Sequence, residues 1–141
     1  MDFEFIVTDE GWVDVVIHDD LPIMADALRD SLGTRPPCGA PQDGPSTYWL
    51  DRAVIHLRDR LENPGDEPIA SGNTTYLEIN HGMVGARYDY DPVDSDYVDR
   101  VPADELLDLL QAWRRKTLVE SPLADERMPP LPTARPMPPA P

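Results

Sequence analysis

Two stretches of the sequence alternate apolar and polar residues on either side of a short turn, and this pattern constrains the fold more than any other. Residues 3–18 contain "FEFIVT" and "WVDVVIH" around a turn with Gly11, and residues 74–90 contain "TTYLEI" and "MVGARYDY" around His81 and Gly82. An alternation of period two places successive side chains on opposite faces of a strand, and a short glycine-containing turn joins antiparallel neighbours. The sequence therefore predicts two β-hairpins.

Two segments between these hairpins have the apolar spacing of amphipathic helices. The first covers residues 20–33, where Asp20 is placed to cap the helix, a proline occupies its first turn and Gly33 can end it. The second covers residues 46–65, and either of its first two residues, a serine and a threonine, can serve as the cap. A loop with four prolines and two glycines separates them.

The third expected helix begins at Pro102 and is preceded by a short strand, "YVDRV", over residues 97–101. Leu106, Leu110 and Trp113 align on one face of this helix, which we therefore expect to be buried. Acidic residues lie in its first turn and basic residues in its last, which suits the helix dipole at both ends.

The C-terminal segment differs in character from the rest of the chain. Eight of the last 21 residues are proline, and such a composition cannot build a packed core. We therefore expect a single α+β domain over residues 1–120 and a proline-rich, disordered tail over residues 121–141. In the domain, antiparallel strands from the two hairpins and the short strand form a sheet, and helices pack on one face.

The net charge is strongly negative. The chain has 27 acidic residues against 12 Lys and Arg, for a formal charge of −15, and two acids balance two bases in the tail, so the excess lies in residues 1–120. Such a charge repels nucleic acid and anionic membranes and attracts cationic partners. The alternative interpretation is that the acidity only maintains solubility.

Several features point to the cytoplasm. Cys38 is the only cysteine, so no internal disulfide can form. No apolar run approaches the ~20 residues of a membrane helix, and the first residues lack the basic and apolar regions of a secretory signal. We expect a cytoplasmic protein that contacts neither a membrane nor nucleic acid directly.

Signatures of catalysis are missing from the sequence. It contains no glycine-rich phosphate loop, no nucleophile elbow and no helix with paired zinc-binding histidines. His18, His56 and His81 are far apart, and Cys38 lies in the proline-rich loop. We expect neither an enzyme nor a cofactor, although a site assembled from scattered residues stays open as an alternative.

The stretch from Arg87 to Arg100, "RYDYDPVDSDYVDR", contains five aspartates and three tyrosines and is called the Asp/Tyr segment below. Tyrosine is enriched at the energetic centres of interfaces, and carboxylates pair with arginine through two hydrogen bonds. The segment therefore indicates a surface that binds a basic protein. The expected contact residues are Tyr88, Asp89, Tyr90, Asp91, Asp94, Asp96, Tyr97 and Asp99.

Two other interpretations of this segment stay open. It can be a hydrated loop in which some tyrosines face the core, because Tyr88 and Tyr90 share strand parity with apolar residues before them. It can also bind calcium, which takes six to eight oxygen ligands, often from one loop. However, the sixth and twelfth positions counted from Asp89 hold Asp94 and Arg100 instead of the glycine and glutamate of an EF-hand.

The C-terminal third of the domain also carries a family resemblance. "TYLEINHGMVGARYDYDP" followed by "YVDRVPADELLDLLQAWRR", between Thr75 and Arg115, resembles small acidic immunity proteins of bacterial polymorphic toxin systems. The resemblance implies a cytoplasmic, non-enzymatic protein that binds and blocks a cognate toxin domain, often a basic nuclease. The leading hypothesis is thus an immunity-type inhibitor. The alternative is an acidic nucleic-acid mimic or adaptor that occupies a DNA- or RNA-binding protein.

Overall fold

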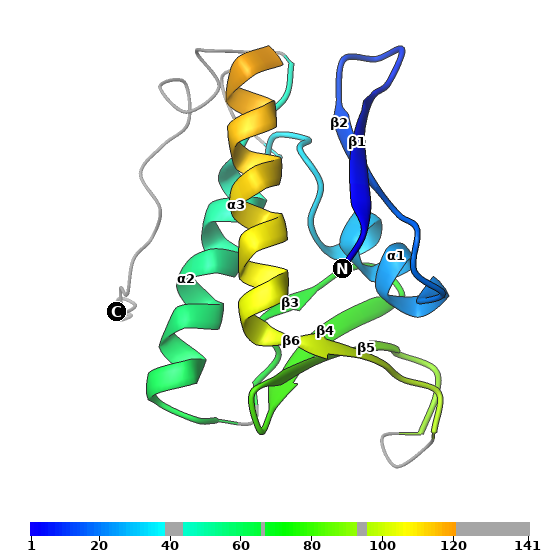
Figure 1. Cartoon of the computed structure of the whole chain (residues 1–141), viewed down its shortest axis with the longest axis vertical. Helices are drawn as coiled ribbons and strands as arrows, with labels where there is room; N and C mark the ends of the chain where they lie inside the picture. The colour runs from blue at the N-terminus through cyan, green and yellow to red at the C-terminus, as the bar shows by residue number, and fades with distance from the viewer. Residues whose placement is uncertain (39–43, 66, 93–95, 121–141) are drawn as a thin grey trace.

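The computed structural model describes residues 1–38, 44–65, 67–92 and 96–120 and confirms the α+β class. Figure 1 shows the arrangement of its helices and strands. The elements in chain order are β1 (Phe3–Val7), β2 (Val13–Ile17), α1 (Pro22–Ser31), α2 (Tyr48–Glu62), β3 (Ala70–Ser71), β4 (Thr75–Asn80), β5 (Met83–Tyr88), β6 (Asp99–Pro102) and α3 (Ala103–Glu120). The predicted tail lies outside the described residues.

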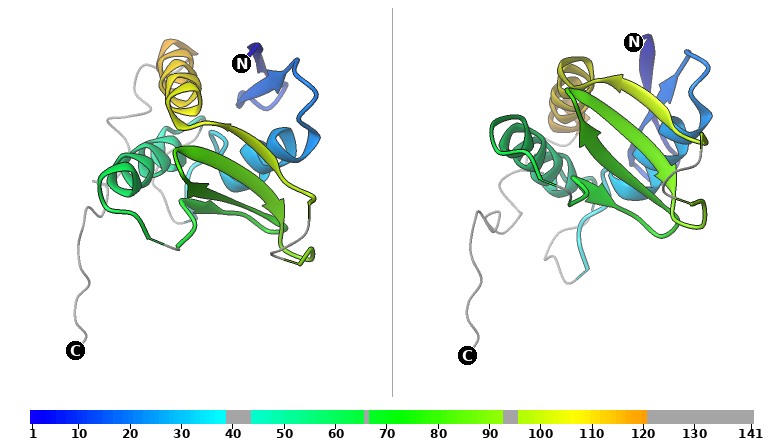
Figure 2. Two further views of the ribbon diagram at one scale, coloured as in Figure 1. Left: turned by 60° about the horizontal axis from the view of Figure 1, so that its bottom comes forward. Right: turned by 90° about the horizontal axis from the view of Figure 1, so that it is seen from below.

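The strands form two antiparallel sheets. β1 and β2 make a two-stranded sheet, and β3, β4, β5 and β6 make a four-stranded sheet in that order. The first hairpin does not join the larger sheet because α1 packs against β2 on one side and against β4 and β5 on the other. Three helices accompany these strands in the described chain, and Figure 2 shows them above one face of the four-stranded sheet, as the sequence predicts.

The second hairpin turns where the sequence predicts. β4 and β5 pair from Thr75 opposite Tyr88 to Asn80 opposite Met83, which leaves two residues in the turn. Both have positive φ, 54° at His81 and 77° at Gly82. This is the backbone of a type I′ turn, whose twist matches that of the strands it joins. Glycine adopts this conformation without a steric penalty.

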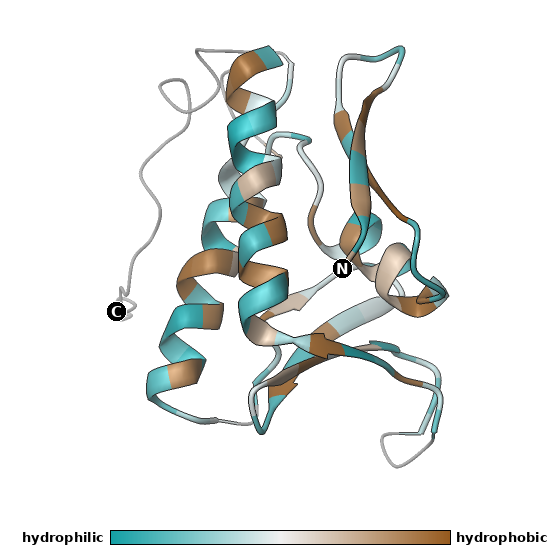
Figure 3. Ribbon diagram, in the orientation of Figure 1, coloured by the Kyte–Doolittle hydropathy of each residue, from teal (hydrophilic) through white to brown (hydrophobic). Residues whose placement is uncertain are grey.

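The core lies between the helices and the inner face of the larger sheet. In α3, the predicted apolar face is confirmed, because Leu106, Leu110 and Trp113 are fully buried. In α2, the buried stripe runs through Leu50 and Leu57. Figure 3 colours the ribbon by hydropathy and shows apolar and polar residues alternating along both helices. Burial of each such leucine contributes about 1.5–3 kcal/mol.

The start of α1 differs from the sequence prediction, whereas the start of α2 agrees with it. α1 begins at Pro22 with Leu21 at the N-cap position, so the expected cap by Asp20 is wrong. α2 begins at Tyr48 directly after the two predicted cap residues. Thr47 occupies the cap position, and the hydroxyl oxygen of Ser46 accepts a hydrogen bond from the Tyr48 amide at 3.0 Å. A tertiary contact replaces the local cap of α1, as described below. β3 was not predicted, because two residues are too few to show alternation.

Candidate partner-binding surface

The Asp/Tyr segment connects the end of β5 to the start of β6 and lies at the lower right in Figure 1. Residues 93–95, and with them Asp94, lie outside the described residues. Two backbone hydrogen bonds hold the first part of the segment. The amide of Asp89 donates to the carbonyl of Thr74 at 2.8 Å, and the amide of Asp91 donates to the carbonyl of Tyr88 at 3.2 Å. The first part of the segment thus extends the β4–β5 hairpin beyond the sheet.

Two tyrosine rings in the segment are strongly exposed. Tyr90 is 73% exposed and Tyr97 is 68% exposed, the highest and third highest values among the large apolar side chains exposed in the described chain. Asp89 and Asp96 beside them are exposed too, and Asp91 is half-buried. Most of the predicted contact residues that the structure describes therefore lie at the surface. Tyrosine is one of the residue types enriched at the energetic centres of interfaces.

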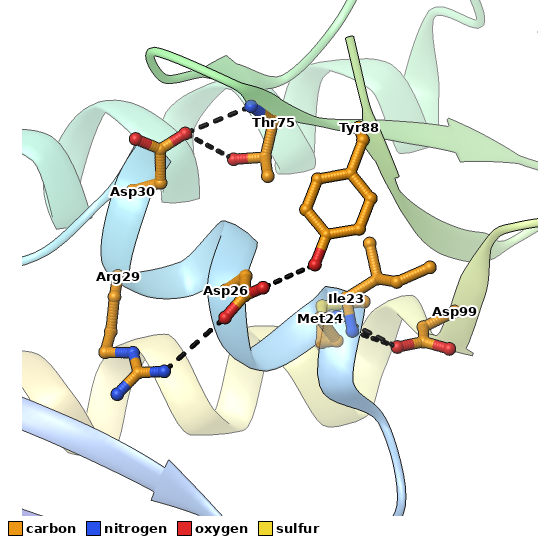
Figure 4. A network of polar contacts seen from close by, with 8 residues as sticks. All are labelled: Ile23, Met24, Asp26, Arg29, Asp30, Thr75, Tyr88 and Asp99. Carbon is orange, nitrogen blue, oxygen red and sulfur yellow. Dashed lines mark hydrogen bonds and ion pairs between the residues drawn. The ribbon is translucent and has the colours of Figure 1, made fainter. Parts of the chain in front are cut away.

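Tyr88 connects the Asp/Tyr segment to α1. Its hydroxyl donates a short hydrogen bond to the carboxylate of Asp26 on α1 (Figure 4). This bond, together with burial and the charge of Asp26, raises the pKa of Tyr88 to about 12. Its ring also stacks on Tyr90, with centroids 5.1 Å apart and planes 14° from parallel. The half-buried Tyr88 therefore holds the exposed Tyr90 ring in place.

Asp99 holds the other end of the segment against the same helix. Its Oδ2 accepts hydrogen bonds from the amides of Ile23 at 2.6 Å and Met24 at 3.0 Å (Figure 4). These are amides of the first turn of α1, which have no acceptor within the helix and favour a negative charge. We therefore reassign Asp99 from the predicted contact residues to the fold, because its carboxylate serves as the cap of α1.

A third carboxylate fixes the opposite end of α1. Asp30 accepts hydrogen bonds from the amides of Asn73, Thr74 and Thr75 at 2.9–3.1 Å and from the Thr75 hydroxyl at 2.7 Å. Burial alone would raise the pKa of Asp30, but the bonds from Thr75, Thr74 and Asn73 together lower it below 3.8. Asp26, Asp30 and Asp99 thus tie α1 to the strands on both sides of the Asp/Tyr segment.

The acids at the start of α3 do not extend the field of the segment. They lie beyond the far end of β6, whose four residues span roughly 13 Å. Screening at physiological ionic strength acts over about 8 Å. One of these acids, Glu105, already accepts a hydrogen bond from the N-terminal amine at 2.9 Å. The segment is therefore an acidic surface in its own right.

The residues considered for catalysis lie on separate elements. His18 follows β2 and pairs with Glu4 at 2.9 Å, His56 is on α2, and His81 is in the β4–β5 turn. Burial, with the charges of neighbouring arginines, lowers the pKa of His56. Cys38 is exposed. That the chain is not an enzyme stays a prediction.

Neither metal binding nor membrane insertion finds support in the described chain. No group of three or more His, Cys, Asp or Glu side chains there is arranged to hold a metal ion. Calcium binding by the segment stays a prediction, because Asp94 is outside the described residues. No helix in the same part of the chain is long and apolar enough to span a bilayer.

Comparisons of the chain with protein-family models, curated proteins and solved structures gave no match. The functional interpretation therefore depends on the geometry of the site. Sequence analysis missed Asp26, whose partner Tyr88 is 62 residues away. No local pattern could have identified it, since its contact depends on how α1 packs against β5.

Proposed function

We propose that the protein is an immunity-type inhibitor that binds and neutralises a basic toxin domain through the Asp/Tyr segment. The observation that carries the proposal is the pair of exposed rings, Tyr90 and Tyr97, beside the exposed carboxylates of Asp89 and Asp96. Tyrosines supply rigid contact area with few rotatable bonds, and the carboxylates select a partner rich in arginine or lysine. The resemblance of the stretch from Thr75 to Arg115 to small acidic immunity proteins supports the same proposal.

The anchoring of the segment adds to this proposal. Tyr88 and Asp99 attach its two ends to α1 through the bonds to Asp26 and to the first turn of the helix. Side chains that are held in place before binding lose less conformational entropy when the complex forms. The acidic charge also accelerates encounter with a cationic protein, and salt weakens this effect.

The test compares two variants of equal charge. In the first, Asp89, Asp91 and Asp96 are replaced by Asn. In the control, three acids elsewhere on the surface are neutralised, as Asp20→Asn, Glu62→Gln and Asp108→Asn, all of which are exposed in the structure. Wild type, variant and control are immobilised, and proteins from the native organism are captured on each. Candidate partners are those held by wild type and control and released by the first variant.

Each candidate partner is then expressed alone and with the three forms of the inhibitor. The proposal expects a partner that arrests growth and is neutralised by wild type and control only. Replacing Tyr90 or Tyr97 with Ala should weaken its binding by tenfold or more, which corresponds to about 1.4 kcal/mol. If the first variant neutralises the partner as well as the control does, the segment is a hydrated loop. If the partner is a harmless DNA- or RNA-binding protein that nucleic acid displaces, the protein is a mimic.

A further inference from the structure

The two strands of the first hairpin differ in whether the backbone N–H and C=O groups on their outer edges have hydrogen-bond partners or are buried. In an antiparallel pair, residues that exchange backbone hydrogen bonds with the opposite strand alternate with residues whose backbone groups point outward. The amide of His18 donates to the carbonyl of Asp2, and the amide of Thr8 donates to the carbonyl of Trp12, both at 2.8 Å. Together with the register of the strands, these two bonds fix which residues face the partner strand.

β1 has an open outer edge. Glu4 and Ile6 turn their backbone groups towards β2, so Phe3, Phe5 and Val7 turn theirs away from it. No described residue makes a hydrogen bond to these outward backbone groups. An extended chain can pair with such an edge, and each added residue pair then satisfies two backbone groups.

The corresponding edge of β2 is covered at Val13 and Val15. The amide of Val13 donates to the hydroxyl oxygen of Thr34 at 2.8 Å, and its carbonyl accepts a hydrogen bond from the indole of Trp113 at 2.7 Å. Both groups of Val13 point away from β1 in the same register. Val15, the next outward residue of β2, is buried. The fold therefore covers the β2 edge at these two positions, whereas Val7 on the β1 edge is exposed.

The open edge also exposes apolar side chains. Ile6 is 47% exposed and Val7 is 44% exposed. Beside them, Phe5 packs against Phe3 and Trp113, with ring centroids 5.4 and 6.4 Å away. A strand added at this edge would cover the exposed apolar residues and rest beside a fixed aromatic group.

The charge of the N-terminal segment selects the occupant. Residues 1–28 contain eight acidic residues and no Lys or Arg. A second copy of the chain would bring two acidic hairpins together, which like charge disfavours. The tail from residue 121 has eight prolines in 21 residues, and proline has no amide to donate to a ladder. We propose that β1 accepts an extended, lysine- or arginine-bearing segment of a partner protein by strand addition.

This proposal goes beyond the Asp/Tyr segment, which lies at the opposite end of the molecule from the β1–β2 turn (Figure 1). The probe is a short synthetic peptide that alternates lysine with valine. Its counterparts carry glutamate in place of lysine, or proline in place of every second valine. Amide hydrogen exchange of the full chain is followed residue by residue by NMR, with and without each peptide.

In the free protein, the amides of Glu4 and Ile6 should exchange slowly and those of Phe5 and Val7 quickly. The lysine peptide at saturation should slow exchange at Phe5 and Val7 by about tenfold or more, and the other two peptides should not. The proposal is overturned if the lysine peptide protects neither outward amide, or if the glutamate peptide protects them equally. It is also overturned if they become protected as protein concentration rises without peptide, because the occupant is then a second copy.

Two variants separate this edge from the Asp/Tyr segment. Val7→Pro removes one outward amide that the hairpin does not use, and Val7→Lys keeps the strand but places a cation at the edge. Each should reduce protection of Phe5 by the lysine peptide at least threefold, whereas the Asn variant of Asp89, Asp91 and Asp96 should leave it unchanged. If the lysine peptide protects the Phe5 amide in both Val7 variants as it does in wild type, the proposal of strand addition at β1 is wrong. This outcome does not depend on whether the Asp/Tyr segment binds a partner.

Discussion

The indole Nε1 of Trp113 donates a 2.7 Å hydrogen bond to the carbonyl oxygen of Val13, across 100 residues of sequence. Both side chains are fully buried, and Trp113 also packs against Phe5 of β1. The bond satisfies a polar atom that burial would otherwise leave without a partner. The last helix thereby fixes the position of the first hairpin, which has no strand in common with the larger sheet.

Replacing Trp113 with Ala should lower the free energy of unfolding by about 3–5 kcal/mol, because it leaves a large cavity. Trp113→Phe should cost less than Trp113→Ala, since the ring remains, but it should still lose about 0.5–1.5 kcal/mol, because the Val13 carbonyl then keeps only the 3.3 Å hydrogen bond from the Thr34 hydroxyl. Urea unfolding followed by circular dichroism measures both. A loss below one kcal/mol in the alanine variant would contradict the burial of this side chain.

Stability at alkaline pH should depend on Tyr88. Its pKa is raised from 10 to about 12 in the folded chain, so the bond to Asp26 stabilises the fold fully below pH 10. The contribution is lost as pH rises through 10 towards 12, because the unfolded chain ionises first. We expect the unfolding free energy of the wild type to fall more steeply over this range than that of Tyr88→Phe.

The control for this experiment is Tyr90→Phe, which removes the hydroxyl of a tyrosine that is 73% exposed and keeps the ring that stacks on Tyr88. Urea unfolding at several values of pH above neutrality gives the three slopes. Tyr90→Phe should follow the wild type. Equal slopes for the wild type and Tyr88→Phe would mean that the bond to Asp26 does not persist in solution.

Stability at acidic pH should depend on Asp30, whose contribution is lost as pH falls, whereas that of Tyr88 is lost as pH rises. Its pKa is lowered below 3.8 by the four hydrogen bonds to residues 73–75, which outweigh the effect of burial. The stabilisation is therefore present above pH 3.8 and is lost as pH falls through the lower pKa of the folded chain. Asp30→Asn should be less stable than wild type at neutral pH by roughly 1.5–3 kcal/mol. The difference should shrink in acid.

Urea titrations between neutral and acidic pH measure this convergence, with Asp20→Asn as the control. Asp20 is exposed and does not cap α1, so its loss should leave the acid dependence close to that of the wild type. If the difference in unfolding free energy between Asp30→Asn and wild type stays constant across this pH range, the charge of Asp30 does not stabilise the fold.

The elements that repeat a local pattern were predictable from the sequence. Both hairpins and the buried face of α3 follow from periodicity, and the His81-Gly82 turn follows from backbone preference. Contacts between distant segments were not predictable. Asp20 adjoins α1 in sequence, yet the helix is capped by Asp99, 76 residues after Ile23. A local cap pattern cannot indicate which carboxylate tertiary folding brings to a helix end.

The same limit applies to the candidate site. The exposure of Tyr90, Tyr97, Asp89 and Asp96 agrees with the sequence-based expectation of a surface segment. The sequence does not indicate which residues of the segment support the fold and which can contact a partner. Tyr88 and Asp99 are of the same residue types as the exposed tyrosines and aspartates beside them. Both residues hold the segment against α1, and their hydrogen bonds join residues that are more than 60 positions apart in the sequence.

Gly72 is required by its approach to Asp30. A Cβ built at this position would lie 2.4 Å from Oδ2, 2.6 Å from Cγ and 2.6 Å from the backbone carbonyl oxygen of Asp30. Real contacts are not this short, so either the β3–β4 turn or α1 must shift in Gly72→Ala. We expect a loss of about 1–3 kcal/mol from such overpacking, with weaker protection of the Thr74 and Thr75 amides from hydrogen exchange.

Gly65→Ala is the matched control, because a Cβ there would lie 3.5 Å or more from the side chain of Arg60 and meet no backbone. It should change the unfolding free energy by less than one kcal/mol. Combining Gly72→Ala with Asp30→Ala should restore only part of the loss, since the carbonyl oxygen of residue 30 remains in the way. If Gly72→Ala is as stable as Gly65→Ala, α1 does not lie this close to the turn, and the hydrogen bonds of Asp30 to residues 73–75 would be contradicted with it.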